Sequence, residues 1–469
     1  SNGGLHQYAQ NTTTQLNNQG RDLTGNKVDV VWLGGAVPYT VPTGRTVSAY
    51  DNASFGSAID IVHTSLGDVV HVGAPGKASG DGQLFSYYLT ASRKAWTAET
   101  GLISGAPLQG SSTSFWGGFG SEVVSREVGS FSEAWAGMPA INLVGSIAPG
   151  SSFSSAIGGA PDSQFGADNA ISAAGQKLVI GGPGGYGSLS VYSTPLATGA
   201  QPDLIFGGFY YDTAPSQLAM RPNIANPALA NEGFGVGGQY VSEGFVLAGT
   251  NDATAYPNRI YNFRRRGPTF VPLRAADNTD VSTLMPALAP KAEAGSAVAI
   301  DGKLAVVGAP DYDNRGAVFV YAIDAADNWT LEAMLQPVGL KNGDRFGESV
   351  SISGERVIVG SPGWDHPLQG YDAGRVVMYE RFSAETGSVA WLQQSEFTGP
   401  SQYGKFGTDV DLFGTTAIAS QPSGLDSQRK VSVYSADAQG EWASTASFPG
   451  NSDSLAVSQD HIVIGETGG

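Results

Sequence analysis

Apolar residues alternate with small or polar ones along short stretches of this chain. Residues 298–301 read Val-Ala-Ile-Asp, and the same period of two runs through residues 350–353 and 410–413. This period is that of a β-strand with one buried face. Each stretch ends in a pair whose glycine can supply the positive φ of a tight turn: Asp301-Gly302, Ser353-Gly354 and Phe413-Gly414. Each therefore predicts a β-hairpin.

These hairpins belong to a repeat. The clearest three units run from Ala294 to Pro310, Phe346 to Pro362 and Phe406 to Pro422, and each proline follows the first residue by 16 positions. Upstream, Phe-Gly pairs at residues 55, 119, 165 and 234 open further units, and residues 451–467 form a degenerate eighth. A repeat of this kind predicts supersecondary units that are stacked or arranged radially.

Each unit carries two more predicted strands. Residues 318–321 represent the third strand, and a tryptophan marks the fourth at positions 96, 329, 391 and 442. Four antiparallel strands per unit form the blade of a β-propeller, which leaves only short, protected edges. The predicted fold is all-β: a β-propeller of four-stranded antiparallel blades, with eight blades favoured and seven the alternative. An open β-solenoid or a sandwich explains the long loops less well.

The two ends of the chain predict ring closure. The eighth unit stops after two strands, which would leave an exposed hydrophobic edge. Residues 28–33, Val-Asp-Val-Val-Trp-Leu, form a strand without a Phe-Gly segment before it, and we expect it to complete the last blade. Residues 1–27 are polar and predict a flexible arm, so residues 28–469 are interpreted as a single propeller domain.

Composition narrows the function. The net charge is −17, from 25 Lys and Arg against 42 Asp and Glu, which disfavours nucleic acid and anionic membranes as partners. No apolar run is long enough to insert into a membrane, and the absence of cysteine excludes disulfides and thiolate metal sites. This composition suits an extracellular or cell-surface protein, and we expect that a signal peptide has been removed.

The Phe-Gly and Gly-Ala-Pro pattern, with the following strand Gly-Ala-Val-Phe-Val-Tyr, resembles the FG-GAP repeats of the integrin α-subunit propeller and of bacterial surface proteins. The resemblance covers about residues 28–469 and is closest over 294–448. It implies a propeller that serves adhesion or recognition outside the cell. The calcium loop of integrin-type repeats is replaced here by minimal turns such as Asp301-Gly302, so no calcium site is carried over and no cofactor is predicted.

Other carboxylates cluster after the Gly-x-Pro element. They are Asp311, Asp313, Asp365 and Asp372. Their side chains could hold a divalent cation such as calcium, but aspartate also stabilises tight turns through neighbouring backbone groups, and we favour turns.

Catalytic motifs do not support an enzyme. The chain contains no Gly-x-Ser-x-Gly elbow, His-Glu-x-x-His pair or P-loop. His63 and His71 lie on the two arms of one predicted hairpin and could approach each other, but two imidazoles are an incomplete zinc set, and strand-surface histidines are favoured.

Ligand-binding candidates lie in insertions. Residues 104–118 contain Phe115 and Trp116, and the segment 195–232 contains Phe209, Tyr210 and Tyr211. These aromatic side chains could stack on sugars or anchor a protein, or the loops could instead cover a blade edge. Another candidate set is Arg264, Arg265 and Arg266, which could grip an acidic polysaccharide or form a solvated strand end.

Three functions remain open. The first is an extracellular, non-enzymatic recognition or adhesion module that binds a protein or carbohydrate ligand through inter-blade loops. The second is a structural subunit that self-associates into a filament, layer or other assembly. The third, less favoured, is a polysaccharide-degrading enzyme on a propeller scaffold.

Overall fold

The computed structural model of the chain describes residues 293–324, 329–384, 387–423, 429–449, 454–458 and 461–465. Before residue 293 it describes the strands given below together with residues 58 and 75. The predicted arm at residues 1–27 lies outside the described residues.

The described strands form seven four-stranded antiparallel sheets, each in chain order, and one three-stranded sheet. We call them units one to eight. Units one to four are β2–β5 (Ile59–Thr64, Gly67–Ala74, Gln83–Leu89, Trp96–Ala98), β6–β9 (Val123–Val128, Phe131–Met138, Leu143–Ile147, Ser155–Gly158), β10–β13 (Ile171–Ala174, Lys177–Gly182, Ser188–Ser193, Leu204–Phe206) and β14–β17 (Phe234–Val241, Phe245–Thr250, Ile260–Arg266, Thr269–Pro272). Units five to eight are β18–β21 (Val298–Asp301, Leu304–Ala309, Ala317–Ile323, Trp329–Leu335), β22–β25 (Val350–Ser353, Arg356–Ser361, Arg375–Ser383, Val389–Thr398), β26–β29 (Val410–Phe413, Thr416–Gln421, Lys430–Ala436, Trp442–Pro449) and β30–β31 (Ser454–Val457, His461–Gly465) with β1 (Asp29–Val31).

The hairpins predicted from the sequence are confirmed. Gly302, Gly354 and Gly414 have φ values of 57°, 60° and 59°, as the tight turns between first and second strands require. The four tryptophans predicted to mark fourth strands lie in β5, β21, β25 and β29.

The Gly-x-Pro glycine marks the place where neighbouring units touch through their backbones. Within unit six, the amide of Gly360 donates to the carbonyl of Ser349 over 2.9 Å, and Gly347 donates to the carbonyl of Gly360 over 2.9 Å. A Cβ built on Gly360 would lie 2.0 Å from the carbonyl oxygen of Gly407 in unit seven, and one on Gly308 would lie 2.1 Å from that of Gly347. Only glycine permits this approach.

The core lies between the faces of adjacent sheets. Phe346 is fully buried in a cluster that contains Val320 of unit five together with Val359 and Val377 of unit six. Burying a side chain of this size stabilises the fold by about 2–3 kcal/mol. The phenylalanine of each Phe-Gly pair in these units therefore fastens one sheet to the next, which explains its recurrence.

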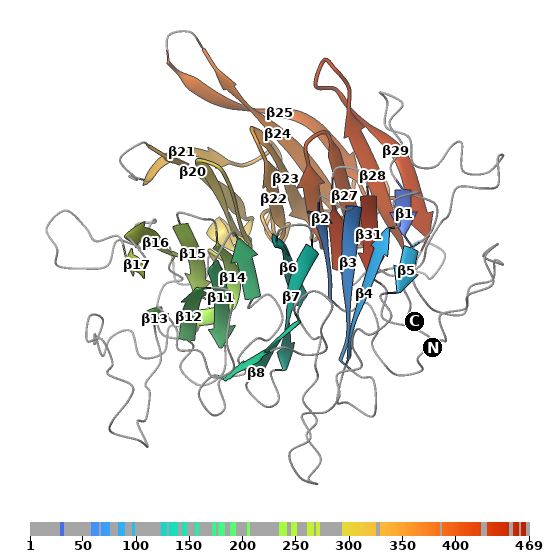
Figure 1. Cartoon of the computed structure of the whole chain (residues 1–469). Coiled ribbons are helices and arrows are strands. Elements are labelled where there is room, and N and C mark those ends of the chain that lie inside the picture. The colour runs from blue at the N-terminus through green and yellow to red at the C-terminus, as the bar shows by residue number, and fades with distance from the viewer. Residues whose placement is uncertain are drawn as a thin grey trace, which may run out of the picture.

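The sheets follow one another in sequence order. The first strand of each unit contacts that of the next, in the order β2, β6, β10, β14, β18, β22, β26 and β30, and β30 also contacts β2. Figure 1 shows the sheets standing side by side, with the strands of unit one next to those of unit eight.

The strand predicted at residues 28–33 joins the last sheet as β1. It pairs with β31 through register partners Val30 and Ile462, and β1 and β31 lie together in Figure 1. The pairing is parallel, whereas the prediction was an antiparallel blade. No hairpin joins two strands from opposite ends of the chain, so the antiparallel direction that a short turn imposes elsewhere is not imposed here.

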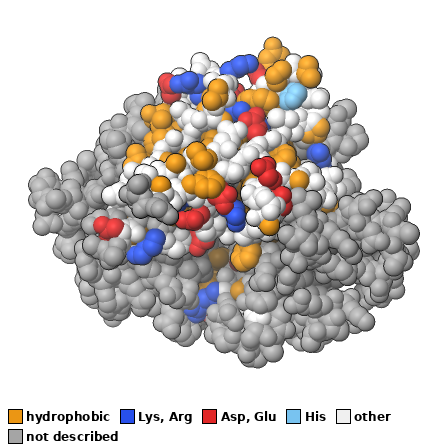
Figure 2. All heavy atoms as spheres, turned by 90° about the horizontal axis from the view of Figure 1, so that it is seen from above, with side chains coloured by type: hydrophobic (Ala, Val, Ile, Leu, Met, Phe, Trp, Pro, Cys, Tyr) orange, Lys and Arg blue, Asp and Glu red, His pale blue; other side chains and the backbone are white. Residues whose placement is uncertain are grey.

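The surface seen in Figure 2 is mixed. Hydrophobic side chains are scattered among acidic and basic ones over the described part of this face. Single exposed apolar side chains are common on folded proteins, so their local grouping is the informative feature. None of the helices in the described residues is long and apolar enough to cross a membrane.

Candidate functional site

Most aromatic and basic candidates from the sequence remain untested. Phe115, Trp116, Phe209, Tyr210 and Tyr211 lie outside the described residues. The three arginines at 264–266 form the end of β16 and pair with residues 269–271 of β17, so they belong to a strand, and their side chains are outside the described part.

The four aspartate candidates take part in local contacts. Asp311 accepts a hydrogen bond from Arg345 and Asp313 pairs with Arg315, while Asp365 accepts one from the amide of Asp372 over 3.0 Å. A 3-10 turn, η4 (Tyr312–Asn314), follows Asp311. In the described part of the chain, no three His, Asp or Glu side chains are grouped so that they could hold a metal ion.

The expectation of strand-surface histidines is wrong for His71. Its side chain is 3% exposed, and Nε2 lies 3.0 Å from Ser132 Oγ on β7 of the next unit. Burial lowers the pKa of His71 to about 3, so the ring is neutral at physiological pH. In the register of β2 and β3, His71 is opposite Asp60 and His63 is opposite Asp68, so the two histidines are not cross-strand partners.

The loop that follows the Gly-x-Pro element joins the second and third strands of a unit. Because successive strands run in opposite directions, this loop lies at the same end of the sheets as the connection from one unit to the next. Backbone hydrogen bonds join them: Phe346 donates to Arg315 over 3.1 Å, and Tyr403 donates to Tyr371 over 2.8 Å. We call this end of units five to seven the loop face. It comprises residues 293–297, 310–316, 336–349, 362–374 and 399–409.

In units five to seven, an uncommon backbone conformation occurs at the residue before the Phe-Gly pair, or before Ala294-Gly295 in unit five. Glu293, Arg345 and Lys405 have φ values of 47°, 53° and 53°. A non-glycine residue in the left-handed region costs about 1–2 kcal/mol, and such strain is concentrated at functional sites. The sequence held a signal for it, because the same position is glycine at residues 118, 233 and 450. Charged side chains occupy the position only in units five, six and seven.

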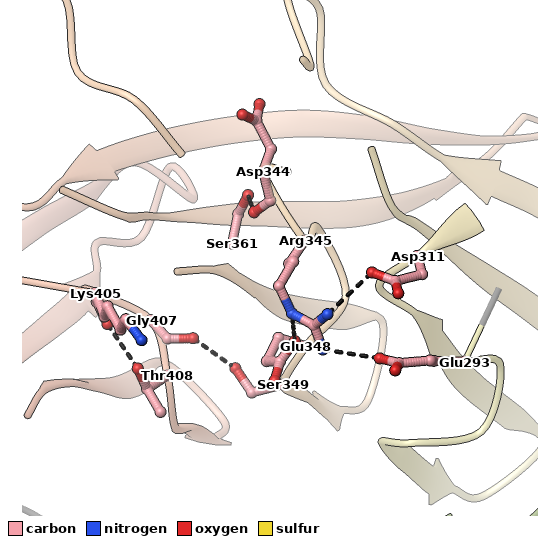
Figure 3. Close-up of polar contacts among 10 residues, drawn as sticks. All are labelled: Glu293, Asp311, Asp344, Arg345, Glu348, Ser349, Ser361, Lys405, Gly407 and Thr408. Atoms are coloured by element: carbon pink, nitrogen blue, oxygen red, sulfur yellow. Dashed lines mark hydrogen bonds and ion pairs between the residues drawn. The ribbon is translucent and has the colours of Figure 1, made fainter. Parts of the chain in front are cut away.

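Arg345 stands at the centre of an acidic cluster, shown in Figure 3. Its guanidinium donates to Glu293 over 2.8 Å, to Asp311 over 2.9 Å and to Glu348 over 2.6 Å. Burial opposes the charge, but the bonds to Glu348 and Glu293 outweigh it and raise the pKa of Arg345. One cation against three carboxylates leaves an excess of two negative charges, so this cluster fastens units five and six and offers no place for an anion.

A second group on the loop face is aromatic and exposed. Leu368, Tyr371 and Tyr403 are 88%, 64% and 53% exposed. Lys405 is exposed beside them, with its amide bonded to the carbonyl of Asp372, and its ammonium makes no ion pair with any described residue. We call Leu368, Tyr371, Tyr403 and Lys405 the tyrosine patch. The sequence analysis missed it, because both tyrosines stand in short loops without any insertion.

A buried arginine supports the loop that carries the patch. Arg375 is 2% exposed, and its guanidinium carbon lies 5.1 Å from the centre of the Trp364 ring. Nη1 donates to Glu396 over 3.2 Å, and the Trp364 ring in turn meets His366 edge to face at 5.4 Å. These contacts hold the start of the 362–374 loop, so the patch stands on a fixed support.

Comparison with known proteins identifies one repeat. Residues 329–379, which run from the start of β21 into β24, match the family model described as FG-GAP repeat. The resemblance predicted from the sequence is thereby confirmed. The match spans about a tenth of the chain.

Comparison of whole chains adds little. No curated protein matches the chain. Among solved structures, the chain is similar to a putative 6-phosphogluconolactonase from Bacteroides uniformis, with 11% identity, a TM-score of 0.43 and coverage of 96% of this chain and 98% of that one. A likeness at this level carries no inference about activity.

Proposed function

We propose that this chain is an extracellular, non-enzymatic recognition module, built as a closed propeller of eight blades, that binds a glycan through the tyrosine patch. An FG-GAP repeat is typical of propeller modules for recognition or adhesion. Closure is supported by the contacts of β30 with both β26 and β2, which continue the order of first strands back to its beginning.

The observation that carries this function is the exposed pair Tyr371 and Tyr403, which stand on two adjacent loops joined by a backbone hydrogen bond of 2.8 Å. Exposed aromatic rings with polar neighbours bind by stacking on one side and hydrogen bonding on the other. The neighbours here are Lys405 and Gln402, which are exposed, and Asp372, which is half-buried. A protein partner of standard size would need about 800 Å² of surface with an apolar centre, and this small, polar-edged group fits a sugar chain better.

Binding to a glycan array, followed by titration calorimetry of any glycan that binds, tests this function. We expect Tyr371→Ala and Tyr403→Ala each to weaken binding about tenfold, since one aromatic contact contributes on the order of 1 kcal/mol beyond its buried area. Phe382→Ala is the matched control, because Phe382 is 45% exposed but lies on β24 away from the loop face. An array without a bound glycan, or an equal loss in all three variants, would contradict the proposal.

A structural subunit is the second candidate, favoured by the outermost strands. Leu331 and Met334 on β21 and Leu392 on β25 are about half exposed, and each of these strands pairs on one side only within its sheet. Unpaired edges with apolar side chains favour association with another chain. Light scattering over a range of protein concentrations tests it. A mass that stays at one chain throughout would exclude self-association.

A further inference from the structure

Three aspartates lie on, or directly before, the strands that flank the last unit. Asp409 and Asp411 belong to the start of unit seven, at β26, and Asp60 lies on β2 of unit one. Strand β30 contacts both β26 and β2 and therefore stands between them. This is the place where the two ends of the chain meet in one sheet, through the pairing of β1 with β31.

Asp411 connects three units. One carboxylate oxygen accepts from the amide of Val457 on β30 over 2.8 Å. The other accepts from the amide of Leu412 over 2.8 Å and from the hydroxyl of Ser351 on β22 over 3.0 Å. Asp409 accepts a hydrogen bond from the amide of Leu455, so both aspartates of unit seven hold the backbone of β30.

Asp60 makes the corresponding connection on the other side. Its carboxylate accepts from the amide and the hydroxyl of Ser125 on β6, the latter over 2.9 Å, and from its neighbour Ile61. The charge of Asp411 acts on Asp60 as well as on Asp409, although Asp60 belongs to a different unit. Asp411 therefore repels both Asp60 and Asp409 when the groups are ionised.

The surroundings of all three carboxyl groups disfavour the ionised form. Each keeps some exposed surface, yet protein atoms enclose it so closely that burial is the largest influence on its pKa. Burial, with a smaller contribution from the charge of Asp411, raises the pKa of Asp60 to about 6 and that of Asp409 to about 7. Burial also raises the pKa of Asp411.

No described cation compensates them. Strands β22, β27 and β30, which pack against β26, contain no titratable residue, and Arg356 on β23 is paired with Glu380. Opposite Asp60 stands the neutral ring of His71. Strand β31, which also contacts β2, begins with His461, whose side chain lies outside the described residues. Arg126 on the neighbouring strand β6 is already paired with Glu133 on β7 over 2.8 Å.

We propose that Asp60, Asp409 and Asp411 form a pH-sensitive latch on the last sheet, which holds β30 and β31 more tightly in mildly acidic surroundings than in alkaline ones. At about pH 5 Asp60 and Asp409 are largely protonated, so their repulsion with Asp411 falls while the hydrogen bonds to backbone and hydroxyl groups remain. At about pH 8 Asp60 and Asp409 are ionised on either side of β30. The sheet that joins the two chain ends therefore responds to pH.

The direction follows from proton linkage. A carboxyl whose pKa is higher in the folded protein than the ordinary 3.8 binds more protons when folded. Its contribution to stability is full below about pH 4 and is lost as the pH rises through about 6 for Asp60 and about 7 for Asp409.

Hydrogen–deuterium exchange of the full chain tests the latch. Protection factors for residues 454–465, corrected for the intrinsic pH dependence of exchange, are compared at about pH 5 and about pH 8. We expect protection to be about tenfold or more higher at the lower pH, since one unit of pKa corresponds to tenfold in an equilibrium constant. Asp409→Asn removes a titrating group at constant shape and should reduce this ratio severalfold.

A matched control comes from unit five. Asp301 also bridges two units, accepting from the amide of Gly354 over 2.6 Å, but it is exposed and far from β30 in the order of units. Asp301→Asn should keep the wild-type ratio. If Asp409→Asn does not fold, Asp411→Asn replaces it.

Two results would overturn the latch. One is a wild-type protection factor for residues 454–465 that does not change with pH or is greater at pH 8. The other is a variant at Asp409 or Asp411 that keeps the full wild-type ratio. Because the readout is exchange in the last sheet, failure of the latch is distinguishable from failure of glycan binding at the loop face.

Discussion

Replacing the Gly-x-Pro glycine of unit six tests the physical meaning of the repeat. In Gly360→Ala the new methyl group would lie 2.0 Å from the carbonyl oxygen of Gly407 and 2.3 Å from Ser349 Oγ. The serine side chain can rotate away, but the carbonyl belongs to the backbone of unit seven. Gly407 cannot retreat freely, because its amide donates to the carbonyl of Ser420 over 2.8 Å.

The cost can be worked from these distances. Restoring an ordinary contact of about 3.4 Å requires the two backbones to separate by more than 1 Å across a packed interface. Overpacking of this kind costs about 1–3 kcal/mol, and disturbing the hydrogen bond of Gly407 adds about 1 kcal/mol. We therefore expect Gly360→Ala to lower the free energy of unfolding by about 2–4 kcal/mol.

Gly354→Ala separates this close contact from the general cost of replacing glycine. Gly354 has a φ of 60° and no atom within 4 Å of its built Cβ, so the substitution meets only backbone strain of about 1–2 kcal/mol. The assay is urea unfolding followed by tryptophan fluorescence, with the midpoints of the two variants compared at equal slope. If Gly360→Ala unfolds at the same midpoint as Gly354→Ala, the close approach between units does not explain the repeat.

Two further substitutions test the ion pairs between and within units. Glu332 accepts two bonds from Arg381 and one from the indole of Trp391, so Glu332→Ala should cost about 2–3 kcal/mol in urea unfolding at pH 7. The hydrogen bond from Arg381 is the main cause that lowers the pKa of Glu332. The stability that Glu332 contributes is therefore full above its ordinary pKa of 4.5 and is lost as the pH falls below that value. An equal cost of Glu332→Ala at pH 7 and at pH 3 would refute this. Arg375 is buried with Nε and Nη2 unbonded and pairs with Glu396, which is 29% exposed and keeps contact with water. Arg375→Met should therefore change the free energy of unfolding by less than about 1.5 kcal/mol, and a loss of 3 kcal/mol or more in the same assay would show that the ion pair is worth more than its desolvation.

Several features of the fold followed from local pattern. The strand 298–301 and its turn at Gly302 were predicted because period two and a glycine are properties of neighbouring residues. The four-stranded sheets followed from counting strands within one unit. The pairing of residues 29–31 with the last sheet followed from an unmatched strand at each end of the chain, although its parallel direction did not, because no turn dictates it.

The candidate site was less accessible from the sequence. Long insertions drew attention to Phe115 and Tyr210, whereas the tyrosine patch stands in short loops. Tyr371 and Tyr403 are 32 positions apart in the sequence, and they come together only because one loop of unit six lies against the connection to unit seven. A trace of the site was present in the residue before Phe-Gly, which is glycine in three units and charged in units five to seven.

The sequence by itself determined the strands, the repeat and the glycines that let units approach, because these depend on spacing along the chain and on the size of one residue. Only the tertiary structure decided that Arg345 would be surrounded by three carboxylates and that His71 would be buried. It also decided that Asp60 and Asp411 would act on each other across β30. Such contacts join units far apart in the chain, and they are set by the packing of whole sheets, which no local pattern records.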